Sequence, residues 1–479
     1  MTDTTPRAIG ASSPLDPATL DAAVAGLVAT LSDLIRIPSV NPPDPPGEEL
    51  RAAQYIASVL ADAGLVPEVV EPFPGRGSVG ARLHGDGTGG EPLLLLSHLD
   101  VVPAPAEGWT HDPFGGDVAD GYVWGRGAVD MKDTIALDIA VVQLLAAETR
   151  AAGRDPATDP VPGLTRDLLF ASTADEEAGG VEGIGWVVDH RPAWLQAAGG
   201  LNECGGVSVA IGGRRLYPIQ IAEKGFAVYR ITVRGTAGHG SMPRTDNAVV
   251  LGAEAVRRLA EPGPARVTPV MARFLESAAA AMPADVARVF RAVASGDERL
   301  ANAALDAACD PMYARAARAL VRDTISPDVF HSGVKYNVIP GTAELHVDCR
   351  VLPGTTEPAM RAEIVRRLGP ELAAHCEIDL VIFGEPVESP IDSRLYEVLE
   401  ATIRDHDELG IPLPVMAPFA TDAKHAARLG VPTYGFSPLR LDDDERFLER
   451  FHGVDERVGV EALRWGLPVL YDAVRRFCG

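Results

Sequence analysis

The stretch PLLLLSHLDVVP (residues 92–103) decides the fold. It is a short, continuous apolar run, which is typical of a strand buried on both faces, as in a parallel sheet. DLLFASTADEE (167–177) has the same form, and GVSVAI (206–211) has it more weakly. A helical pattern, DTIALDIAVVQLLAAET (133–149), lies between the first two runs. This alternation of strand and helix predicts an α/β fold with a mainly parallel central sheet.

Two helices are expected before this region. Residues 17–36 have helical apolar spacing, and the Pro-rich stretch IPSVNPPDPPGEE (37–49) interrupts it. A second helical pattern runs from Glu48 to about Gly64.

The sequence pattern changes after Glu223. FAVYRITVRG (226–235) and TAELHVDCRVL (342–352) alternate apolar and polar residues, as half-solvated strands do. Helical patterns follow these two strands, at 247–260 and 357–369 respectively. The sequence therefore predicts a small α+β insert.

The insert closes with EIDLVIFGEP (377–386), after which α/β character returns. Within it, residues 261–330 are rich in Ala and Arg and mostly helical in pattern, which predicts an extra helical insertion. The expected organisation is a discontinuous larger domain, 1–222 and 386–479, interrupted by a smaller domain, 223–385.

Charge and cysteine content exclude several classes of partner. The formal net charge of −24 argues against nucleic acid, because phosphate binding needs a cationic footprint, and against docking on anionic lipid. The five cysteines are odd in number and have no CxxC spacing, so a reducing compartment fits best. MTDTTPRAIGASSPLDP has no apolar signal-peptide core, and no apolar run reaches about 18 residues. We expect a cytoplasmic protein without a membrane partner.

Two residues of the first strand are candidates for a metal site. SHLDVVP places His98 and Asp100 two residues apart, so their side chains point to the same face of a strand. A ligating histidine usually needs a partner that fixes its tautomer, and a carboxylate two residues on could influence the ring. The alternative interpretation is a solvent-exposed histidine at the end of a strand.

Further candidates follow the other predicted elements. Asp130 in GRGAVDMKD lies between a Gly-rich loop and a helix start, where Asp is also common as an N-cap. Glu176 and Glu177 in STADEEAGG point in different directions, so one can bind a metal while the other faces a substrate. A solvated acidic turn is the alternative there. LNECGG offers Glu203, and FHGVDERV offers His452.

The joint occurrence of these residues carries the argument for a metal site. They lie at or just past the predicted ends of buried elements, where open α/β sheets place their sites. Imidazole together with carboxylate suits Zn²⁺, with Co²⁺ or Mn²⁺ as alternatives. The expected ligands are His98, Asp130, Glu177, Glu203 and His452.

With these residues the chain resembles the M20 family of metallopeptidases and deacylases. That family includes aminoacylases, acetylornithine and succinyl-diaminopimelate deacylases, carboxypeptidases and dipeptidases. The matching segments appear in the family's order and are SHLDVVP, GRGAVDMK, ADEEAGG, NECGG, GHGSMP, NVIPGTAE, DCRVLPG and HGVDE. Ser97 stands where the family usually has Gly before the first histidine, and Cys204 where it often has Gly after the fourth ligand. Neither departure removes a ligand.

The resemblance implies a role for each ligand. Asp130 would bridge two Zn²⁺ ions, with His98 and Glu203 completing one position and Glu177 and His452 completing the other. It also implies a zinc-peptidase-like catalytic domain and a smaller dimerisation or lid domain. A homodimer is therefore expected.

The resemblance also implies how the reaction proceeds. Asp100 would orient His98. Glu176 would be the general base, taking a proton from water activated by the two metals and delivering it to the leaving amine. Raising the pKa of Glu176 towards the working pH would suit this role.

Three residues of the insert are candidates for substrate contacts. In the family, the histidine that matches His239 reaches across a dimer interface and stabilises the oxyanion of the partner's site. The amide of Asn337 could bond the same oxygen or the substrate. Arg350 is the candidate for a free α-carboxylate, which a guanidinium binds bidentately. The alternatives are a loop histidine, a turn residue before a proline, and a surface ion pair.

The segment ATDAKHAARLGVP resembles a pocket-lining part of the family but has no expected metal role. Thr421 or Asp422 is expected to cap a helix, and His425 is left outside the ligand set.

The predicted function is metal-dependent hydrolysis of an amide bond in a peptide or N-acyl amino acid that bears a free carboxylate. A biosynthetic deacylase of acetylornithine or succinyl-diaminopimelate is the alternative within enzymes. The length of the insertion at 261–330 favours a peptidase-like or broad acylase member. A non-catalytic binding protein on the same fold is the alternative from another class.

Overall fold

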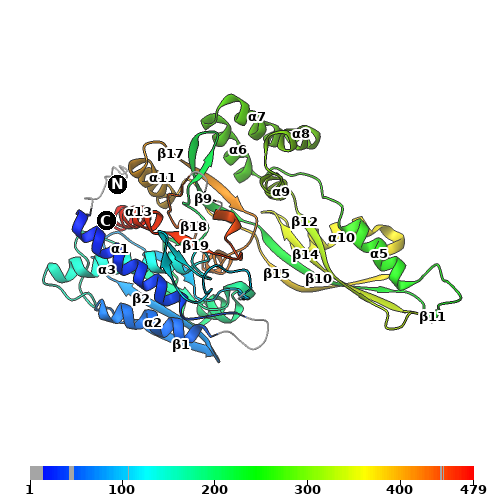
Figure 1. The fold of residues 1–479 in the computed structure, drawn as a ribbon, viewed down its shortest axis with the longest axis horizontal. Helices are drawn as coiled ribbons and strands as arrows, with labels where there is room; N and C mark the ends of the chain where they lie inside the picture. Colours follow the sequence, from blue (N-terminus) through cyan, green and yellow to red (C-terminus); the bar gives the residue numbers. More distant parts are fainter. Residues whose placement is uncertain (1–14, 42–47, 106, 443–444, 446) are drawn as a thin grey trace, which may run out of the picture. The chain divides into compact units, whose positions relative to one another are not determined.

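The chain divides into two compact units, which are described separately. The computed structural model describes residues 15–41, 48–105, 107–442, 445 and 447–479 (Figure 1). Unit 1 consists of Met1–Ile221, Ser389–Pro414 and Thr421–Gly479, and unit 2 of Ala222–Glu388 and Val415–Ala420. The sequence boundaries were expected at 222/223 and 385/386, and no pattern indicated that Val415–Ala420 joins the second unit.

The largest sheet contains ten strands among the described residues, in the order β1–β2–β6–β3–β7–β18–β9–β16, with β8 and β17 also paired to β9. These strands are β1 (Glu68–Phe73), β2 (Arg76–Leu83), β3 (Leu93–His98), β6 (Leu168–Thr173), β7 (Gly199–Asn202), β8 (Val209–Ile211), β9 (Arg214–Glu223), β16 (Val387–Glu388), β17 (Gly410–Ala417) and β18 (Thr433–Gly435).

The centre of this sheet is parallel and its flanks are antiparallel. β3 pairs in parallel with β6 and β7, and β18 pairs in parallel with β7. β2–β6 and β9–β18 are antiparallel. β3 and β6 are buried along their whole length, because both faces of these apolar strands are covered. The predicted α/β fold is confirmed.

One expected strand of this sheet was wrong. GVSVAI was interpreted as a weak buried parallel strand, but β8 covers only its last three residues, is partly exposed and pairs antiparallel with β9. The parallel strand at this place is β7, which consists of the residues GGLN. Its two glycines leave no apolar run that the pattern could detect.

The helices of unit 1 cover this sheet and one another. They are α1 (Pro17–Ile35), α2 (Glu49–Asp62), α3 (Lys132–Ala151), α4 (Trp186–His190), α11 (Arg394–His406), α12 (Ala423–Ala426) and α13 (Val460–Cys478). α1 packs against α3 and α13, α11 packs against α13, and α2 packs against β2. A small sheet of β4 (Val118–Ala119), β5 (Tyr122–Trp124) and β19 (Arg457–Gly459) completes the unit.

The expectation that no segment is long and apolar enough to span a membrane is wrong for α1. Within the described part of the chain it is the one helix that is long and apolar enough to cross a membrane by length and composition. It nevertheless packs against α3 and α13 and buries Leu27, Leu31 and Leu34 on one face. That one-sided burial is typical of a core helix in a globular unit.

Lys132 joins α3 to the end of α1. It is the first residue of α3 and is fully buried. Its Nζ donates to the carbonyl oxygens of Leu34 at 2.9 Å and Ile37 at 2.8 Å. Both oxygens also accept backbone N–H groups, from Ile37 and Ser39 respectively, so Nζ is a second partner for each carbonyl. Burial lowers the pKa of Lys132 to about 7.

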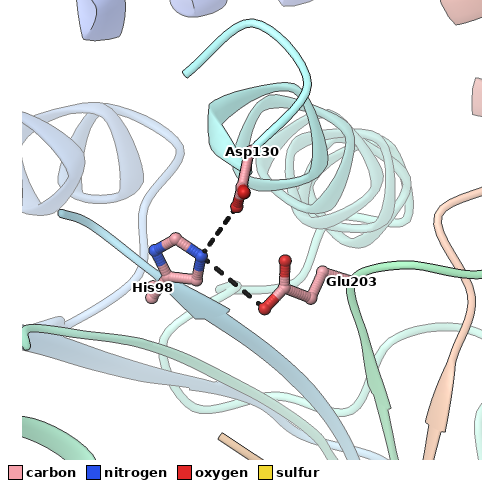
Figure 2. Close-up of side chains that lie close together, drawn as sticks. All are labelled: His98, Asp130 and Glu203. Atoms are coloured by element: carbon pink, nitrogen blue, oxygen red, sulfur yellow. Dashed lines mark hydrogen bonds and ion pairs between the residues drawn. The ribbon is translucent and has the colours of Figure 1, made fainter. Parts of the chain in front are cut away.

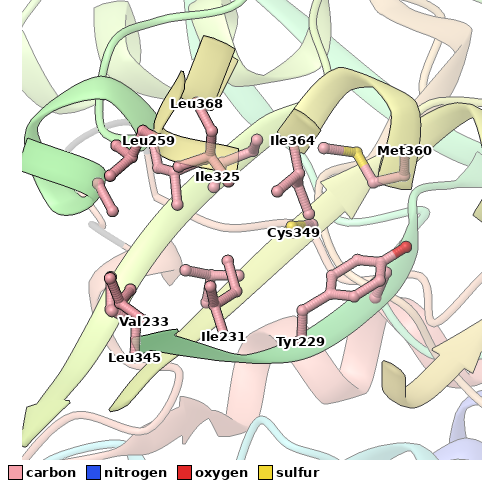
Figure 3. Packing of buried hydrophobic residues seen from close by; sticks show 14 of the residues in the cluster. Tyr229, Ile231, Val233, Leu259, Ile325, Leu345, Cys349, Met360, Ile364 and Leu368 are labelled. Atoms are coloured by element: carbon pink, nitrogen blue, oxygen red, sulfur yellow. The ribbon is translucent and has the colours of Figure 1, made fainter. Parts of the chain in front are cut away.

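Unit 2 contains a four-stranded antiparallel sheet in the order β12–β14–β10–β15. The strands are β10 (Gly225–Arg234), β12 (Thr324–Ser332), β14 (Thr342–Val351) and β15 (Cys376–Gly384). Figure 3 shows the core of this unit, where side chains of β10 and β14 meet those of α5 (Ala248–Leu259) and α10 (Glu357–Ala373). The two alternating strands and two helices expected here are present.

The helical insertion consists of α6 (Pro269–Ala281), α7 (Ala284–Ala294), α8 (Glu298–Ala308) and α9 (Pro311–Leu320). The helical pattern was extended too far, because β12 begins at Thr324. Most residues of this edge strand are exposed or half-buried, so it lacks the apolar alternation that would have identified it. A two-stranded ribbon of β11 (Gly238–His239) and β13 (Val338–Ile339) is also part of unit 2.

Candidate metal centre

The first ligand candidate lies at the carboxyl end of a central strand. His98 is the last residue of β3 and its side chain is 1% exposed. Its Nδ1 lies 3.0 Å from the backbone oxygen of Asp100, which leaves Nε2 available to the neighbouring carboxylates. Nε2 lies 3.2 Å from Oδ1 of Asp130 and 3.6 Å from Oε1 of Glu203 (Figure 2).

These three residues form what we call the inner triad: His98, Asp130 and Glu203. Glu203 follows β7 directly, and Asp130 precedes α3 by two residues. One ligand atom from each residue lies within 4.8 Å of the other two, which is the spacing of groups that can hold a metal ion. All three side chains are mostly buried, and two of them, His98 and Glu203, are positioned by strands of the central sheet.

A second group, the outer triad, shares Asp130 with the first and adds Glu177 and His452. Nε2 of His452 lies 3.2 Å from Oδ2 of Asp130 and 3.4 Å from Oε2 of Glu177. Asp130 therefore presents one oxygen to each triad. Oε1 of Glu177 is buried and has no hydrogen-bond partner among the described residues. An unpartnered carboxylate oxygen beside an imidazole and a second carboxylate fits a divalent cation.

Asp100 holds the turn that carries the two glutamates. Its carboxylate accepts the backbone N–H groups of Glu176 at 3.1 Å and Glu177 at 3.0 Å. Oδ1 of Asp100 is 3.5 Å from Nδ1 of His98. The carboxylate thus fixes the position of the Glu176–Glu177 turn as well as lying beside the histidine ring, which sequence spacing did not indicate.

Glu176 is in neither triad and faces a lysine. Its Oε1 lies 3.7 Å from Nζ of Lys424, and both side chains are nearly buried. Lys424 also donates to the backbone oxygen of Thr421 at 2.9 Å. Burial raises the pKa of Glu176 well above its usual range, although Lys424 acts in the opposite direction. The carboxyl group is thus chemically distinct from that of its neighbour Glu177.

The segment around Lys424 lies against the same turn. Asp422 is the N-cap residue of α12 but makes no side-chain cap; Thr421 Oγ1 instead accepts the Ala423 N–H at 3.2 Å. Oδ2 of Asp422 accepts from Thr173 Oγ1 at 2.9 Å, and Nε2 of His425 lies 2.9 Å from the backbone oxygen of Gly179. His425 is in neither triad.

Two residues near the centre were missed by sequence reasoning. Lys424 lies in a segment whose sequence pattern indicates only a helix cap and a histidine, yet its ammonium group faces Glu176. Asn41 lies in the Pro-rich stretch that was interpreted only as a helix breaker, yet its Nδ2 donates to Oδ2 of Asp100 at 2.8 Å. Arg76 supports Asn41 in turn, donating to its Oδ1 at 2.9 Å.

The carboxylates of the two triads favour protonation of both histidines. Burial lowers the pKa of His98, but Glu203, Asp100 and Asp130 outweigh it and the net shift is strongly upward. Hydrogen bonds to Asp130 and Glu177 raise the pKa of His452 to about 10. A centre that stabilises positive charge at two adjacent positions is electrostatically suited to two cations.

The three candidates of the insert lie in unit 2. His239 on β11 is exposed, with Nδ1 2.7 Å from Oγ of Ser241. The backbone oxygen of Asn337 accepts from Gly240 N at 2.9 Å, so His239 and Asn337 belong to the same ribbon. Arg350 on β14 forms a bidentate pair with Asp348, with both N–O distances at 2.8 Å. The guanidinium of Arg350 thus already binds the carboxylate of Asp348. The substrate roles of these residues stay predictions.

Comparisons with known proteins find similar sequences over most of the chain. A family model described as peptidase family M20/M25/M40 matches residues 94–476. The chain is 26% identical over 431 residues to the N-fatty-acyl-amino acid synthase/hydrolase PM20D1 of Homo sapiens, covering 87% of this chain and 80% of that protein. It is 34% identical over 232 residues to a succinyl-diaminopimelate desuccinylase of Methylorubrum extorquens, covering 46% of this chain and 54% of that enzyme.

A solved structure shares the fold. The M20 family metallo-carboxypeptidase Sso-CP2 from Sulfolobus solfataricus matches with a TM-score of 0.68 at 15% identity, covering 94% of this chain and 99% of that one.

Proposed function

This chain belongs to peptidase family M20/M25/M40 and is a metal-dependent amide hydrolase, and we propose that its substrates are N-acyl amino acids with a free carboxylate. We further propose that the metals are two Zn²⁺ ions. One would be held by the inner triad and one by the outer triad.

The observation that carries this proposal is the position of Asp130. Its two oxygens face different triads, each completed by one histidine and one glutamate. Two imidazoles and three carboxylates are a ligand set that suits Zn²⁺ and also accommodates Co²⁺ or Mn²⁺. Such a pair of ions, when bound, polarises the amide carbonyl and lowers the pKa of the attacking water.

The chain's own groups then have separate tasks. Glu176 lies next to the centre without being part of either triad, and burial raises its pKa, so it suits a general base that accepts a proton and passes it to the leaving amine. Asp100 holds the turn on which Glu176 lies, through the two backbone N–H groups. Lys424 faces Glu176 and limits the orientations that its carboxylate can take.

Similarity over most of the chain supports N-acyl amino acids as the substrate class. The PM20D1 relative, whose name describes both synthesis and hydrolysis of N-fatty-acyl-amino acids, is matched across 87% of this chain. The desuccinylase has a higher sequence identity, but its match covers less than half of this chain. A deacylase of succinyl-diaminopimelate or acetylornithine is therefore the second candidate. The presence of Glu176 beside complete triads gives no support to a non-catalytic protein.

A substrate panel combined with metal replacement tests the proposal. Purified protein would be assayed with N-acyl amino acids of increasing acyl length, dipeptides, N-succinyl-diaminopimelate and N-acetylornithine. We expect N-acyl amino acids to have the highest kcat/KM. Chelation should abolish turnover, and Zn²⁺ should restore it. Activity that survives complete metal removal would contradict the metal-dependent reaction, and a preference for N-succinyl-diaminopimelate would favour the second candidate.

We also propose a homodimer formed through unit 2, in which His239 acts in the partner's active site. Val334 and Tyr336, near the β11–β13 ribbon, are almost fully exposed, and β12 and β15 are the edges of their sheet, which supports an interface there. Mixing inactive Glu176→Ala and His239→Ala proteins should then restore part of the activity. A monomeric mass without complementation would contradict this arrangement.

The remaining assignments of unit 2 and of location are likewise proposals. Asn337 would contact the oxyanion or substrate, and Arg350 the substrate carboxylate, for which it would have to share or exchange its pairing with Asp348. A cytoplasmic location is supported by the five cysteines, all of which are free.

A further inference from the structure

The outer triad depends on a histidine with little packing of its own. The side chain of His452 is 51% exposed, whereas that of His98 in the inner triad is 1% exposed. His452 also has a left-handed backbone conformation, with φ of 57°. Side-chain burial therefore does not explain how His452 is kept within 3.4 Å of Glu177.

A buried glutamate four residues later connects the two loops that supply this half of the centre. Glu456 is 0% exposed. Its Oε1 accepts the backbone N–H groups of Gly127 and Val129, both at 2.9 Å, and so shapes the loop that ends in Asp130. Its own backbone oxygen accepts from Gly125 N at 2.9 Å.

Arg126 extends the connection to the histidine. Its Nη1 donates to Oε2 of Glu456, and its Nη2 donates to the backbone oxygen of His452 at 3.3 Å. Arg126 is 3% exposed, so this guanidinium lies in the interior and contacts both loops at once. A planar guanidinium reaches the two acceptors from two different nitrogens held in one plane, whereas an ammonium group has a single nitrogen.

The ribbon of β5 and β19 keeps the two loops aligned. Arg457 pairs with Trp124, Val458 with Val123 and Gly459 with Tyr122. This pairing begins directly after Glu456 and directly before Gly125. The Arg126–Glu456 ion pair therefore lies where the pairing of β5 and β19 ends and the loops that carry Asp130 and His452 begin.

From this geometry we propose that Arg126 and Glu456 are positioning residues that build the outer metal position by fixing the Asp130 loop and the backbone of His452 together. The inference rests on the proposed two-metal function. Removing a supporting contact behind a metal ligand lowers metal affinity by about 10- to 100-fold. The loss should be confined mainly to the outer ion, because His98 and Glu203 are held by β3 and β7.

Zn²⁺ titration of the metal-free, full-length protein by calorimetry tests the proposal. Arg126→Lys is the main variant, since it keeps a positive charge opposite buried Glu456 but replaces the two nitrogens that reach Glu456 and the His452 oxygen by one. We expect wild type and Arg126→Lys each to bind two Zn²⁺ equivalents, with the second weakened about 10- to 100-fold in the variant and the first, which shares only Asp130, weakened less. Glu456→Gln, which retains an acceptor for Gly127 and Val129 but removes the ion pair, should weaken the same equivalent.

Asp472→Asn is the matched control. Asp472 and Arg476 form another buried ion pair in unit 1, at 2.7 Å with side chains 5% and 1% exposed, and neither residue belongs to a triad. This variant should bind both equivalents as wild type does, even if its melting temperature falls. Circular dichroism and thermal melting of all variants show that each is folded.

Several outcomes would overturn the proposal. An unchanged second equivalent in folded Arg126→Lys and Glu456→Gln would show that the pair does not support the outer position. Equal weakening of both equivalents would show a general effect on the centre. If wild-type protein bound no Zn²⁺, the two-zinc function would fail and this inference with it. Two wild-type equivalents combined with an unchanged second equivalent in the variants would overturn only the inference.

Discussion

The inner and outer triads share Asp130 but are held in place by different means. The inner histidine ends a fully buried central strand, and Glu203 follows another strand of the same sheet. The outer histidine lies on a loop, is half exposed, and is joined by Glu177 from a short turn, Glu176–Ala178. A ligand held by a sheet core needs few polar contacts to stay in place, whereas one on a loop depends on them. We therefore expect the inner ion to be the tighter and less exchangeable of the two.

Removing the shared ligand should have the largest effect, because it breaks both halves at once. Asp130→Ala should lose both Zn²⁺ equivalents and reduce kcat/KM by at least about 10⁴-fold, the upper end of the range that a general base alone contributes. Metal analysis and steady-state kinetics measure this. A variant that kept one tight equivalent would show that the two triads are less dependent on Asp130 than their geometry indicates.

Substitution of Glu176 separates catalysis from metal binding in both halves. Glu176→Gln keeps the shape of the side chain but cannot accept the proton, so kcat should fall by about 10²- to 10⁴-fold while both Zn²⁺ equivalents remain. Loss of either equivalent in this variant would instead place Glu176 among the ligands. Glu182→Gln, at a partly exposed carboxylate that follows the same turn, is the control and should retain turnover.

Replacing each histidine by alanine in turn tests whether the inner and outer triads are held in place by different means. His98→Ala should weaken the first equivalent and His452→Ala the second, each by more than the roughly 100-fold cost of losing a supporting contact. In the metal-free proteins, His98→Ala should lower the melting temperature more than His452→Ala, by about 2 °C or less for each kcal/mol lost, because the shift falls as chain length grows. His452 is half exposed, so its loss removes contacts with Asp130 and Glu177 but little packing. Equal melting shifts would contradict the proposed difference in support.

Without any substitution, Zn²⁺ binding at the outer position should depend on pH. Asp130 and Glu177 raise the pKa of His452 to about 10 in the metal-free protein, so at pH 7 its imidazole carries a proton that Zn²⁺ must displace. Zn²⁺ affinity should therefore rise with pH up to about pH 10, by roughly tenfold per pH unit for each proton released. Calorimetry in buffers of different ionisation enthalpy counts these protons. Affinity that is constant from pH 6 to pH 8 would contradict the exchange.

The same contrast explains what could be predicted from the sequence. β3 and β6 were found because both are continuous apolar runs, and the ligand candidates were found because they follow such runs or belong to family motifs. β7 and β12 were missed, since one contains two glycines and the other is largely exposed. Local periodicity carries no information about strands of either kind.

Polar contacts between distant segments were outside the reach of sequence reasoning. Arg126 and Glu456 are 330 positions apart, and each looks like an ordinary charged residue in its own segment. Asn41 and Lys424 are also ordinary in sequence, and they matter because the fold places them against Asp100 and Glu176 respectively. A motif can indicate which side chains hold a metal, but the contacts that hold those side chains become visible only in three dimensions.

The contact between Lys132 and the end of α1 has a practical consequence for anyone shortening this protein. A chain started after Val40 would remove Leu34 and Ile37, whose carbonyl oxygens accept from Nζ of Lys132, and would leave a buried amine without these two acceptors two residues from Asp130. Such a truncation would change more than a peripheral helix. The first helix should be treated as an inseparable part of the catalytic scaffold when boundaries for expression are chosen.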